Sequence, residues 1–304
     1  MTQGQQPAGA HCFWARYAIL RRSRPLPAGK RHNVAMSHST VSALTIAGSD
    51  SGGGAGIQAD LKAFAAHGVH GLSAIAALTA QHTRGVTVVH VPPVEFLRAQ
   101  IDACFDDFNI GAVKLGMLAT AEVIHAVADA LQTHGPVPLV VDPVMVATSG
   151  ARLLAEDALD ALRTRLLPQA TVLTPNIPEA ELLSGMRIAS AVDAEQALER
   201  LRATGAKAVL LKGAHLDEGA QVVDRYRDAD GATLFTHPRL PIEGHGTGCT
   251  LASAVAANLC LGLPAAQATA EAVAYVGRAL RQGYRPGRGE VRVLDHLGAR
   301  EPQA

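Results

Sequence analysis

From residue 41 onward, short apolar runs alternate with longer amphipathic stretches, and this alternation limits the folds open to the chain. Runs such as 139–141 and 208–211 are apolar at every position, which is typical of strands covered on both faces, as in a parallel sheet. The predicted strands are 42–48, 72–79, 86–91, 111–115, 138–141, 171–173 and 207–211. The predicted helices are 56–67, 93–107, 120–132, 155–166, 178–184 and 193–204. Because strands that alternate with helices form βαβ units, we predict a three-layer, doubly wound α/β domain with a mostly parallel sheet.

The pattern changes toward the C-terminus. Two polar stretches, 221–226 and 232–236, flank the turn sequence Asp228–Gly231 and predict a hairpin. Two alanine-rich segments, 247–261 and 265–281, predict long helices that close the domain. No internal repeat interrupts this order of elements.

Composition excludes several classes of protein. Of the 304 residues, 48% are apolar and 18% are charged, whereas disorder over most of a chain requires low hydrophobicity and high net charge. No run of 18 or more apolar residues is present, so no membrane-spanning helix is expected. The four cysteines form no CxxC pair, which argues against a zinc ribbon or a thioredoxin-type site. Widely spaced single thiols are typical of a reducing compartment, so we predict a cytoplasmic protein.

Charge is unevenly distributed along the chain. Residues 1–36 carry six basic side chains and no acidic one, which leaves 21 basic against 27 acidic side chains in the rest. This mildly acidic body gives no electrostatic reason to expect nucleic-acid binding. The basic segment is Arg-rich like a targeting peptide, but it lacks the apolar core of a secretory signal. We interpret 1–36 as a disordered extension, or as sequence upstream of a start at Met36, followed by one domain over 37–297 and a loose tail over 298–304.

A glycine-rich turn follows the first predicted strand. Five glycines lie within residues 48–56, and their missing side chains let backbone N–H groups approach a ligand. The segment 54–59 has the loose G-x-G-x-x-A form of a dinucleotide site, but no acidic residue between Asp60 and Glu95 is available for the ribose. The one Gly-Lys pair lies in the basic segment and lacks the Ser or Thr of a P-loop. We therefore predict a ligand-contacting turn of another kind; the alternative is a tight strand–helix turn.

A second glycine-rich turn, Gly244–Thr250, opens directly into a predicted helix. The first N–H groups of a helix have no intrahelical acceptor and lie at the positive end of its dipole, so this turn predicts an anion site. In phosphoryl transfer, such donors neutralise charge on the moving group. The alternative is a structural cap with Thr247 as the N-cap. Cys249 lies in the first helical turn, where the dipole is expected to lower its pKa, and it either serves as a base or only packs.

Two acidic residues lie at strand ends. Asp142 closes a buried apolar strand, and Glu179 lies one turn into a helix that follows another. Taken singly, Asp142 is explained as a turn or N-cap residue and Glu179 as compensation of the helix dipole. Taken together, beside two anion-type turns, they predict a Mg²⁺ site, because Mg²⁺ takes one or two carboxylates plus phosphates. Lys212 ends the strand 207–211, where it either reaches a nucleotide phosphate or is simply solvated.

Seven motifs in order carry a resemblance to a known family. They occupy residues 44–60, 79–85, 113–117, 141–145, 173–179, 211–215 and 245–250. Their order resembles that of the ribokinase-like superfamily and, more closely, that of the hydroxymethylpyrimidine/phosphomethylpyrimidine kinases of thiamine biosynthesis. The resemblance spans residues 43–281 and leaves out the basic extension. Each motif alone is moderately specific, but seven in order are highly specific.

The resemblance implies ATP-dependent phosphorylation of 4-amino-5-hydroxymethyl-2-methylpyrimidine at its hydroxymethyl group, and then of the monophosphate to the diphosphate. It implies Mg²⁺ as the metal. A glutamine suits an aminopyrimidine, because its amide offers both a donor and an acceptor to the ring edge. The residues implied are Gln81, Gly48, Asp60 and Met117 for the pyrimidine, Lys212 and Asn176 for ATP, Asp142 and Glu179 for Mg²⁺, and Gly246, Thr247, Gly248 and Cys249 for the anion hole and catalysis.

The resemblance also defines the alternatives. Cys249 stands where the wider superfamily commonly carries an aspartate base, and a thiol must first lose its proton to act as one. Some pyridoxal kinases are similar, so a pyridoxal or pyridoxine kinase is the nearest alternative activity, and a non-catalytic pyrimidine-binding relative is an alternative of another class. No segment between the first strands is long enough for the β-sheet lid of many superfamily members, so no separate lid domain is expected. Relatives are often dimers, so we expect a homodimer.

Overall fold

The computed structural model describes residues 40–146, 153–155 and 157–299. The chain divides into two units, Met1–His38 and Ser39–Ala304, and every described residue belongs to the second. The extension predicted over 1–36 lies outside the described residues. Of the tail predicted over 298–304, the described part includes Ala299, which is buried.

Nine strands form one sheet, and their bounds agree closely with the predicted strands. They are β1 (Ser42–Asp50), β2 (His70–His82), β3 (Gly85–His90), β4 (Ile110–Leu115), β5 (Leu139–Val141), β6 (Val172–Leu173), β7 (Val209–Leu211), β8 (Gln221–Arg227) and β9 (Ala232–Pro238). Their order across the sheet is β3-β2-β1-β4-β5-β6-β7-β8-β9. The six neighbouring strands β2, β1, β4, β5, β6 and β7 run parallel, whereas β3, β8 and β9 pair antiparallel with their neighbours. The mostly parallel sheet is therefore confirmed.

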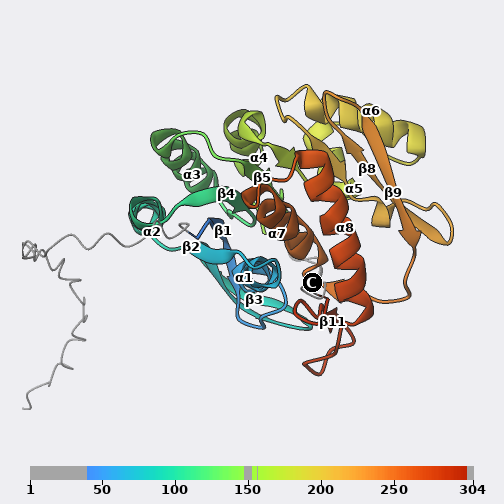
Figure 1. Cartoon of the computed structure of the whole chain (residues 1–304), viewed down its shortest axis with the longest axis horizontal. Helices are drawn as coiled ribbons and strands as arrows, with labels where there is room; N and C mark the ends of the chain where they lie inside the picture. Colours follow the sequence, from blue (N-terminus) through green and yellow to red (C-terminus); the bar gives the residue numbers. More distant parts are fainter. Residues whose placement is uncertain (1–39, 147–152, 156, 300–304) are drawn as a thin grey trace, which may run out of the picture. The chain divides into compact units, whose positions relative to one another are not determined.

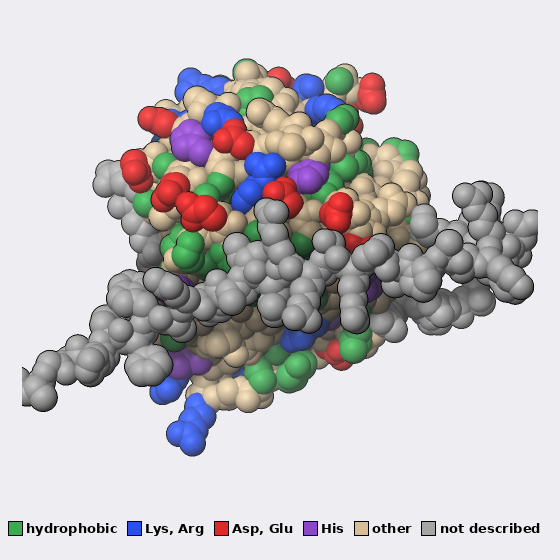
Figure 2. Space-filling view, turned by 90° about the vertical axis from the view of Figure 1, so that its left-hand side faces the viewer, with side chains coloured by type: hydrophobic (Ala, Val, Ile, Leu, Met, Phe, Trp, Pro, Cys, Tyr) green, Lys and Arg blue, Asp and Glu red, His purple; other side chains and the backbone are tan. Residues whose placement is uncertain are grey.

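Helices cover both faces of the sheet (Figure 1). One layer contains α1 (Gly56–Ala66), α7 (Thr247–Cys260) and α8 (Ala265–Arg281), and the other contains α2 (Val94–Asp107), α3 (Ala121–His134), α4 (Ala158–Ala161), α5 (Ile177–Ser184) and α6 (Ala191–Arg202). No helix among the described residues is long and apolar enough to cross a membrane. Figure 2 views the side that carries α2 and α3, where acidic, basic and apolar side chains are mixed on the visible surface.

Alternate residues of the short central strands face opposite helical layers, and both sets are apolar. In β5, Val140 packs in the core beneath α7, while Leu139 and Val141 pack in the core of the other layer. In β7, Leu210 faces the first layer in the same way, and Val209 faces the second. This double coverage is the physical reason why the strands are apolar throughout, and it confirms the three-layer arrangement.

Two local features differ from the predicted elements. The helix predicted over 155–166 begins as α4 and continues as a π-helical turn, Leu162–Leu166, before a 3-10 turn that contains Pro168. Because proline has no N–H to donate, the helical hydrogen bonding cannot continue through this last turn. A second, two-stranded sheet pairs β10 (Gly244–His245) with β11 (Arg292–Val293). This pair joins the second glycine-rich turn to the C-terminal segment.

Candidate active site

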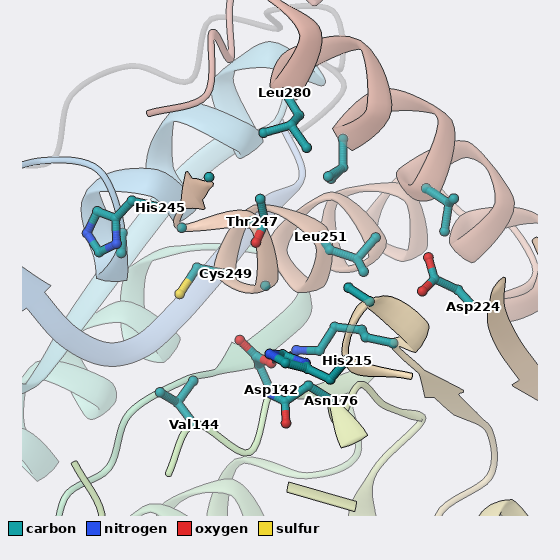
Figure 3. Close-up of a pocket in the computed structure, with 18 of the residues that line it drawn as sticks. Asp142, Val144, Asn176, His215, Asp224, His245, Thr247, Cys249, Leu251 and Leu280 are labelled. Atoms are coloured by element: carbon teal, nitrogen blue, oxygen red, sulfur yellow. Dashed lines mark hydrogen bonds and ion pairs between the residues drawn. The ribbon is translucent and has the colours of Figure 1, made fainter. Parts of the chain in front are cut away.

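A cavity of about 1240 Å³ opens at the carboxyl ends of the parallel strands, the edge at which open α/β sheets bind ligands. Residues at the carboxyl ends of β1 and β2, and residues that follow β5, β6 and β7, meet the start of α7 there; Figure 3 shows several of the side chains. The sequence-predicted residues that line this cavity are Gly48, Gln81, Met117, Asp142, Asn176, Glu179, Lys212, Gly246, Thr247, Gly248 and Cys249. Segments as far apart in the sequence as Gly48 and Cys249 therefore build one site.

The first glycine-rich turn is organised around the buried carboxylate of Asp50. Its oxygens accept hydrogen bonds from the backbone N–H groups of Gly52, Gly54 and Ala55, at 2.7, 3.0 and 2.8 Å. Burial alone would raise the pKa of Asp50, but hydrogen bonds from His245 and from these amides outweigh it, and the pKa lies below its ordinary value. Three backbone N–H groups of the turn therefore bind Asp50 of the same turn and are not available to a ligand. Sequence reasoning did not single out Asp50.

The second glycine-rich turn packs directly against the first. Gly246 is the N-cap of α7 and has a left-handed φ of 82°. A Cβ at this position would lie 1.9 Å from the carbonyl oxygen of Gly54, so no other residue fits without displacing one of the turns. The alternative that made Thr247 the N-cap is wrong, because Thr247 is the first residue of the helix. Residues Gly246–Cys249 at the start of α7 line the cavity, and the first N–H groups of a helix have no intrahelical acceptor, as an anion site requires.

A lysine and two carboxylates lie opposite that helix N-terminus. Lys212 Nζ is 2.9 Å from Asp142 Oδ1 and 3.9 Å from Glu179 Oε2. Burial would lower the pKa of Lys212, but the two carboxylates raise it above its ordinary value. A Cβ on Gly248 would lie 3.1 Å from Lys212 Nζ, which shows how closely the start of α7 approaches this group. The ion pair joins residues that follow β5, β6 and β7.

Glu179 also has a structural role. It forms a capping box with Asn176: Glu179 N donates to Asn176 Oδ1 at 2.9 Å, and Asn176 N donates to Glu179 Oε2 at 2.8 Å. Burial raises the pKa of Glu179 to about 7, the charge of Asp142 adds to this rise, and Lys212 opposes it. The predicted helix-end role of Glu179 and its place in the cavity are therefore both present, because Oε2 accepts from Asn176 N and also faces Lys212 in the cavity.

Cys249 is partly exposed in the first turn of α7. We expected the helix N-terminus to lower its pKa, and this expectation is wrong. Burial raises the pKa of the thiol to about 11, with Lys114 opposing the rise and Asp60 and Asp142 adding to it. Desolvation of a thiolate thus outweighs the dipole and the nearby cation. At neutral pH the group is a thiol.

Beneath Cys249 lies a buried ion pair between Lys114 and Asp60. Lys114 Nζ is 3.0 and 2.9 Å from the two oxygens of Asp60, and both side chains are fully buried. Thr45 and Ser253 donate to the same carboxylate at 2.6 and 2.7 Å. The cluster ties together α1, β1, β4 and α7. Asp60 does not line the cavity, so the predicted contact of its side chain with the pyrimidine is corrected to a supporting position.

The remaining predicted residues lie at the other end of the cavity. A Cβ on Gly48 would lie 3.0 Å from Met117 Sδ, so glycine allows the methionine to close over β1. The Gln81 backbone is held by Ser51, whose hydroxyl donates to Gln81 O at 2.7 Å and accepts from Gln81 N at 2.8 Å. The Gln81 amide lies beside Thr79 and His245. Sequence reasoning missed His245 and Lys114, although each lies inside a quoted motif; a lysine within an apolar strand was the available signal.

Comparisons with known proteins agree with this geometry. The family model described as phosphomethylpyrimidine kinase matches residues 50–294. A hydroxymethylpyrimidine/phosphomethylpyrimidine kinase of Rhizobium meliloti is 51% identical over 261 residues, which cover 83% of this chain and 96% of the relative. The similar protein of Bacillus subtilis is 45% identical, with 83% of this chain and 93% of the relative covered.

Solved structures of two kinds of kinase share this fold. The phosphomethylpyrimidine kinase of Clostridium difficile 630 is 40% identical and has a TM-score of 0.71; the match covers 79% of this chain and 99% of that kinase. A pyridoxal kinase of Bacillus subtilis in complex with ADP is 33% identical, covers 85% of this chain and 98% of its own, and has a TM-score of 0.78. The predicted ribokinase-like fold is confirmed by these structures. From its motifs, its fold and its relatives, the chain belongs to the phosphomethylpyrimidine kinase family, a family of phosphotransferases.

Proposed function

We propose that the protein transfers the γ-phosphoryl group of ATP to the hydroxymethyl group of 4-amino-5-hydroxymethyl-2-methylpyrimidine and then phosphorylates the monophosphate to the diphosphate, in thiamine biosynthesis. One observation carries this proposal: a single cavity holds the Gln81 amide at one end and the Lys212–Asp142–Glu179 group at the other, with a helix N-terminus between them. The names of the most similar relatives support the same substrates.

In this proposal, catalysis comes from positioning and from neutralisation of charge. The amides at the start of α7 donate to the oxygens of the phosphoryl group, and Lys212 balances its charge from the opposite side. The transition state of phosphoryl transfer is largely loose, so the hydroxyl loses its proton late and needs little help from a strong base. Cys249, a thiol at neutral pH, then orients the hydroxyl through its sulfur.

Asp142 and Glu179 are the residues that would hold Mg²⁺. Their carboxylates lie 2.9 and 3.9 Å from Lys212 Nζ in the cavity, and hard oxygen donors are what Mg²⁺ prefers. Within the described part of the chain no group of three or more ligating side chains meets at one place. The fit is therefore that of an ion that takes its remaining ligands from water and nucleotide phosphates. When bound, it would neutralise the charge on those phosphates.

The direct test is an assay of the purified protein with Mg·ATP and the pyrimidine alcohol. We expect ADP to form, and chromatography of the products to show first the monophosphate and then the diphosphate. Absence of ADP would contradict the proposal, and binding without turnover would favour a non-catalytic pyrimidine-binding protein. The similarity to pyridoxal kinases makes pyridoxal the second substrate to assay, and the ratio of the two kcat/KM values separates the activities.

Gln81→Leu tests the pyrimidine end of the cavity. Loss of the amide leaves polar groups of the ring edge unpaired, which costs about 1–3 kcal/mol, so we expect KM for the pyrimidine to rise about 10- to 100-fold with a smaller change in kcat. Steady-state kinetics measure both values. Gln169→Leu is the matched control, because that side chain caps the carbonyl of Arg165 away from the cavity. An unchanged KM in the Gln81 variant would refute the assignment.

Cys249→Ala tests the role of the thiol. We expect kcat to fall about tenfold to 100-fold, while the Kd of the pyrimidine changes little, because the sulfur orients the reacting hydroxyl. Cys260→Ala is the control on the same helix; its buried thiol donates to Ser42 O, so the change affects stability and not kcat. Equal effects of Cys249→Ala on kcat and on binding would mean that Cys249 only packs.

Glu179 predicts a pH dependence. With a pKa of about 7, Glu179 is protonated below this pH and ionised above it, so kcat/KM for Mg·ATP should rise about tenfold between pH 6 and pH 8. Glu179→Gln keeps the capping-box shape and should give a low, flat profile. The folded-state pKa is raised above the unfolded value, so this group's stabilisation is complete below about pH 4.5 and is lost as pH rises through about 7. A variant profile with the wild-type slope would assign the titration to another group.

We also propose that the protein is a cytoplasmic homodimer. The edge hairpin of β2 and β3 supports the dimer, because Leu78 and Val88 are exposed there and an exposed edge strand invites pairing. The free thiols of Cys104, Cys249 and Cys260 support a reducing compartment. Light scattering of wild type and of Val88→Lys tests the dimer; equal masses would place the interface elsewhere.

A further inference from the structure

Three side chains form a connected group at the pyrimidine end of the cavity. His245 Nε2 lies 3.0 Å from Asp50 Oδ2 and 3.1 Å from the terminal nitrogen of Gln81. The imidazole is only 12% exposed and is packed on Gly54, where a Cβ would lie 2.5 Å from its Cδ2 atom. Its orientation is thus fixed by the two glycine-rich turns.

Asp50 determines which nitrogen of His245 carries the hydrogen. The carboxylate accepts three backbone N–H groups, and these bonds together with that from His245 hold its pKa below the ordinary value, so it is ionised at neutral pH. An ionised oxygen at 3.0 Å from Nε2 requires a hydrogen on Nε2, because two lone pairs at that distance repel. His245 is therefore a donor at Nε2.

This assignment restricts the Gln81 amide. A nitrogen of that amide, which has only hydrogens to offer, cannot face the Nε2–H of His245. The other end of the amide raises a matching conflict: its oxygen lies 3.1 Å from Thr79 Oγ1, but the one hydroxyl hydrogen of Thr79 is taken by the carbonyl oxygen of Ser49 at 2.9 Å. Both conflicts are relieved when the amide turns by about 180°. Its nitrogen then donates to Thr79 Oγ1, and its oxygen shares the one Nε2 hydrogen of His245 with Asp50 Oδ2.

We propose that His245 is a positioning residue that locks the Gln81 amide with its oxygen toward His245 and its nitrogen toward Thr79. The proposal rests on the proposed function for its substrate. In the locked orientation, the Gln81 amide offers its oxygen as an acceptor on the side of His245 and of the anion turn, Gly246–Cys249. It offers its nitrogen as a donor on the side of Thr79. The order of these two groups determines which way round a pyrimidine binds.

The order agrees with the chemistry of the substrate. In the 4-aminopyrimidine, the amino donor lies between the ring-nitrogen acceptor and the hydroxymethyl group. Pairing the amino group with the amide oxygen therefore directs the hydroxymethyl group toward His245 and the turn Gly246–Cys249 that follows it. The 4-oxo analogue has the reverse order, a carbonyl acceptor beside an N–H donor. On the locked amide it must bind turned over, with its hydroxymethyl group directed away from the anion turn.

The test compares the amino and oxo substrates in kcat/KM. We expect wild type to prefer the amino compound by about 100-fold or more, because the oxo compound is either mispaired or misdirected. His245→Phe keeps a planar ring but has no donor. The amide can then turn, because the Thr79 hydroxyl can rotate from Ser49 O to the amide oxygen, and the preference should shrink to within about tenfold. His215→Phe is the matched control; His215 lines the same cavity on the other side of Cys249 (Figure 3) and should leave the preference unchanged. A His245→Phe variant that loses activity on both substrates equally would overturn the proposal.

A second measurement separates this inference from the proposed function. In protein labelled at glutamine nitrogen, the side-chain resonances of Gln81, assigned with Gln81→Leu, should show a nuclear Overhauser effect to the Thr79 methyl group. Contacts to the His245 ring alone would overturn the locked orientation, whatever the enzyme phosphorylates. If His245→Phe does not fold, the smaller His245→Leu serves instead, because leucine also offers no hydrogen to the amide. If the Thr79 contact is present but no pyrimidine turns over, only the proposed function fails.

Discussion

Replacing Gly246 with alanine is expected to lower kcat by a factor of about 10²–10³ or more. The residue has a φ of 82°, and a Cβ there would lie 1.9 Å from the Gly54 carbonyl oxygen and 2.9 Å from the Gly54 carbonyl carbon. Real Cβ atoms do not approach backbone so closely, and a backbone carbonyl cannot turn aside as a long side chain can. The two glycine-rich turns must separate, which moves the first amides of α7 away from the phosphoryl group. Loss of one such donor costs this much in rate.

Gly262→Ala is the matched control for this prediction. Gly262 follows the C-terminal end of α7, has a similar φ of 89°, and has open space where a Cβ would be placed. Alanine there carries only the strain of the left-handed backbone, about 1–2 kcal/mol. We expect a lower melting temperature and a wild-type kcat. Comparable kcat values in the two variants would show that the contact between the turns is not needed for catalysis.

A third glycine keeps the prediction testable if Gly246→Ala does not fold. Gly248 has no left-handed φ, and its Cβ would meet the flexible end of Lys212 at 3.1 Å. Gly248→Ala should therefore fold, with Lys212 displaced, and should raise KM for Mg·ATP more than KM for the pyrimidine. The split between the two KM values is the measurement, and a variant with both values unchanged would argue against phosphate binding at this turn.

Local sequence pattern predicted most of the fold because each element is specified by its own neighbours. Strands such as β5 and β7 are apolar at every position, and the turn residues that follow them are read from sequence alone. The pair of β10 and β11 was not predicted, because two residues carry no periodicity and their pairing depends on segments 48 positions apart. The site residues were predicted through motifs. The residues that contact them come from distant parts of the sequence and became known only from the structure.

Cys249 and Asp60 show why chemistry was harder to predict than position. The expected pKa of Cys249 considered only the helix on which it lies, and the decisive contributions come from burial and from charges on β4, on α1 and after β5. Asp60 was predicted to bind the pyrimidine because it lies in a motif that does. Its carboxylate instead pairs with Lys114 and accepts hydrogen bonds from Thr45 and Ser253. The residues that adjoin a helical position in the sequence do not show whether its side chain faces the cavity or the core.

Lys212→Met is expected to lower kcat by about 10²–10³-fold while leaving the Kd of the pyrimidine almost unchanged. Lys212 Nζ lies 2.9 Å from Asp142 and faces the start of α7, on the side of the cavity away from Gln81. Methionine keeps the length and packing of the side chain but offers no charge to the phosphoryl group. Single-turnover kinetics and calorimetry measure the two quantities. Lys207→Met, an exposed change at the other end of the same strand segment, should alter neither.

The same variant has a stability signature that a loss of packing would not give. Without Lys212, the buried carboxylates of Asp142 and Glu179 face each other unpaired, which costs about 3–5 kcal/mol where both are ionised. Lys212 normally opposes the rise in the pKa of Glu179, so its removal raises that pKa further. The destabilisation should therefore be small near pH 5, where Glu179 is protonated, and should grow toward pH 8. Adding Asp142→Asn should restore much of the stability at pH 8 and none of the activity. A destabilisation independent of pH, or a double variant no more stable than the single one, would show that Lys212 acts there by packing alone.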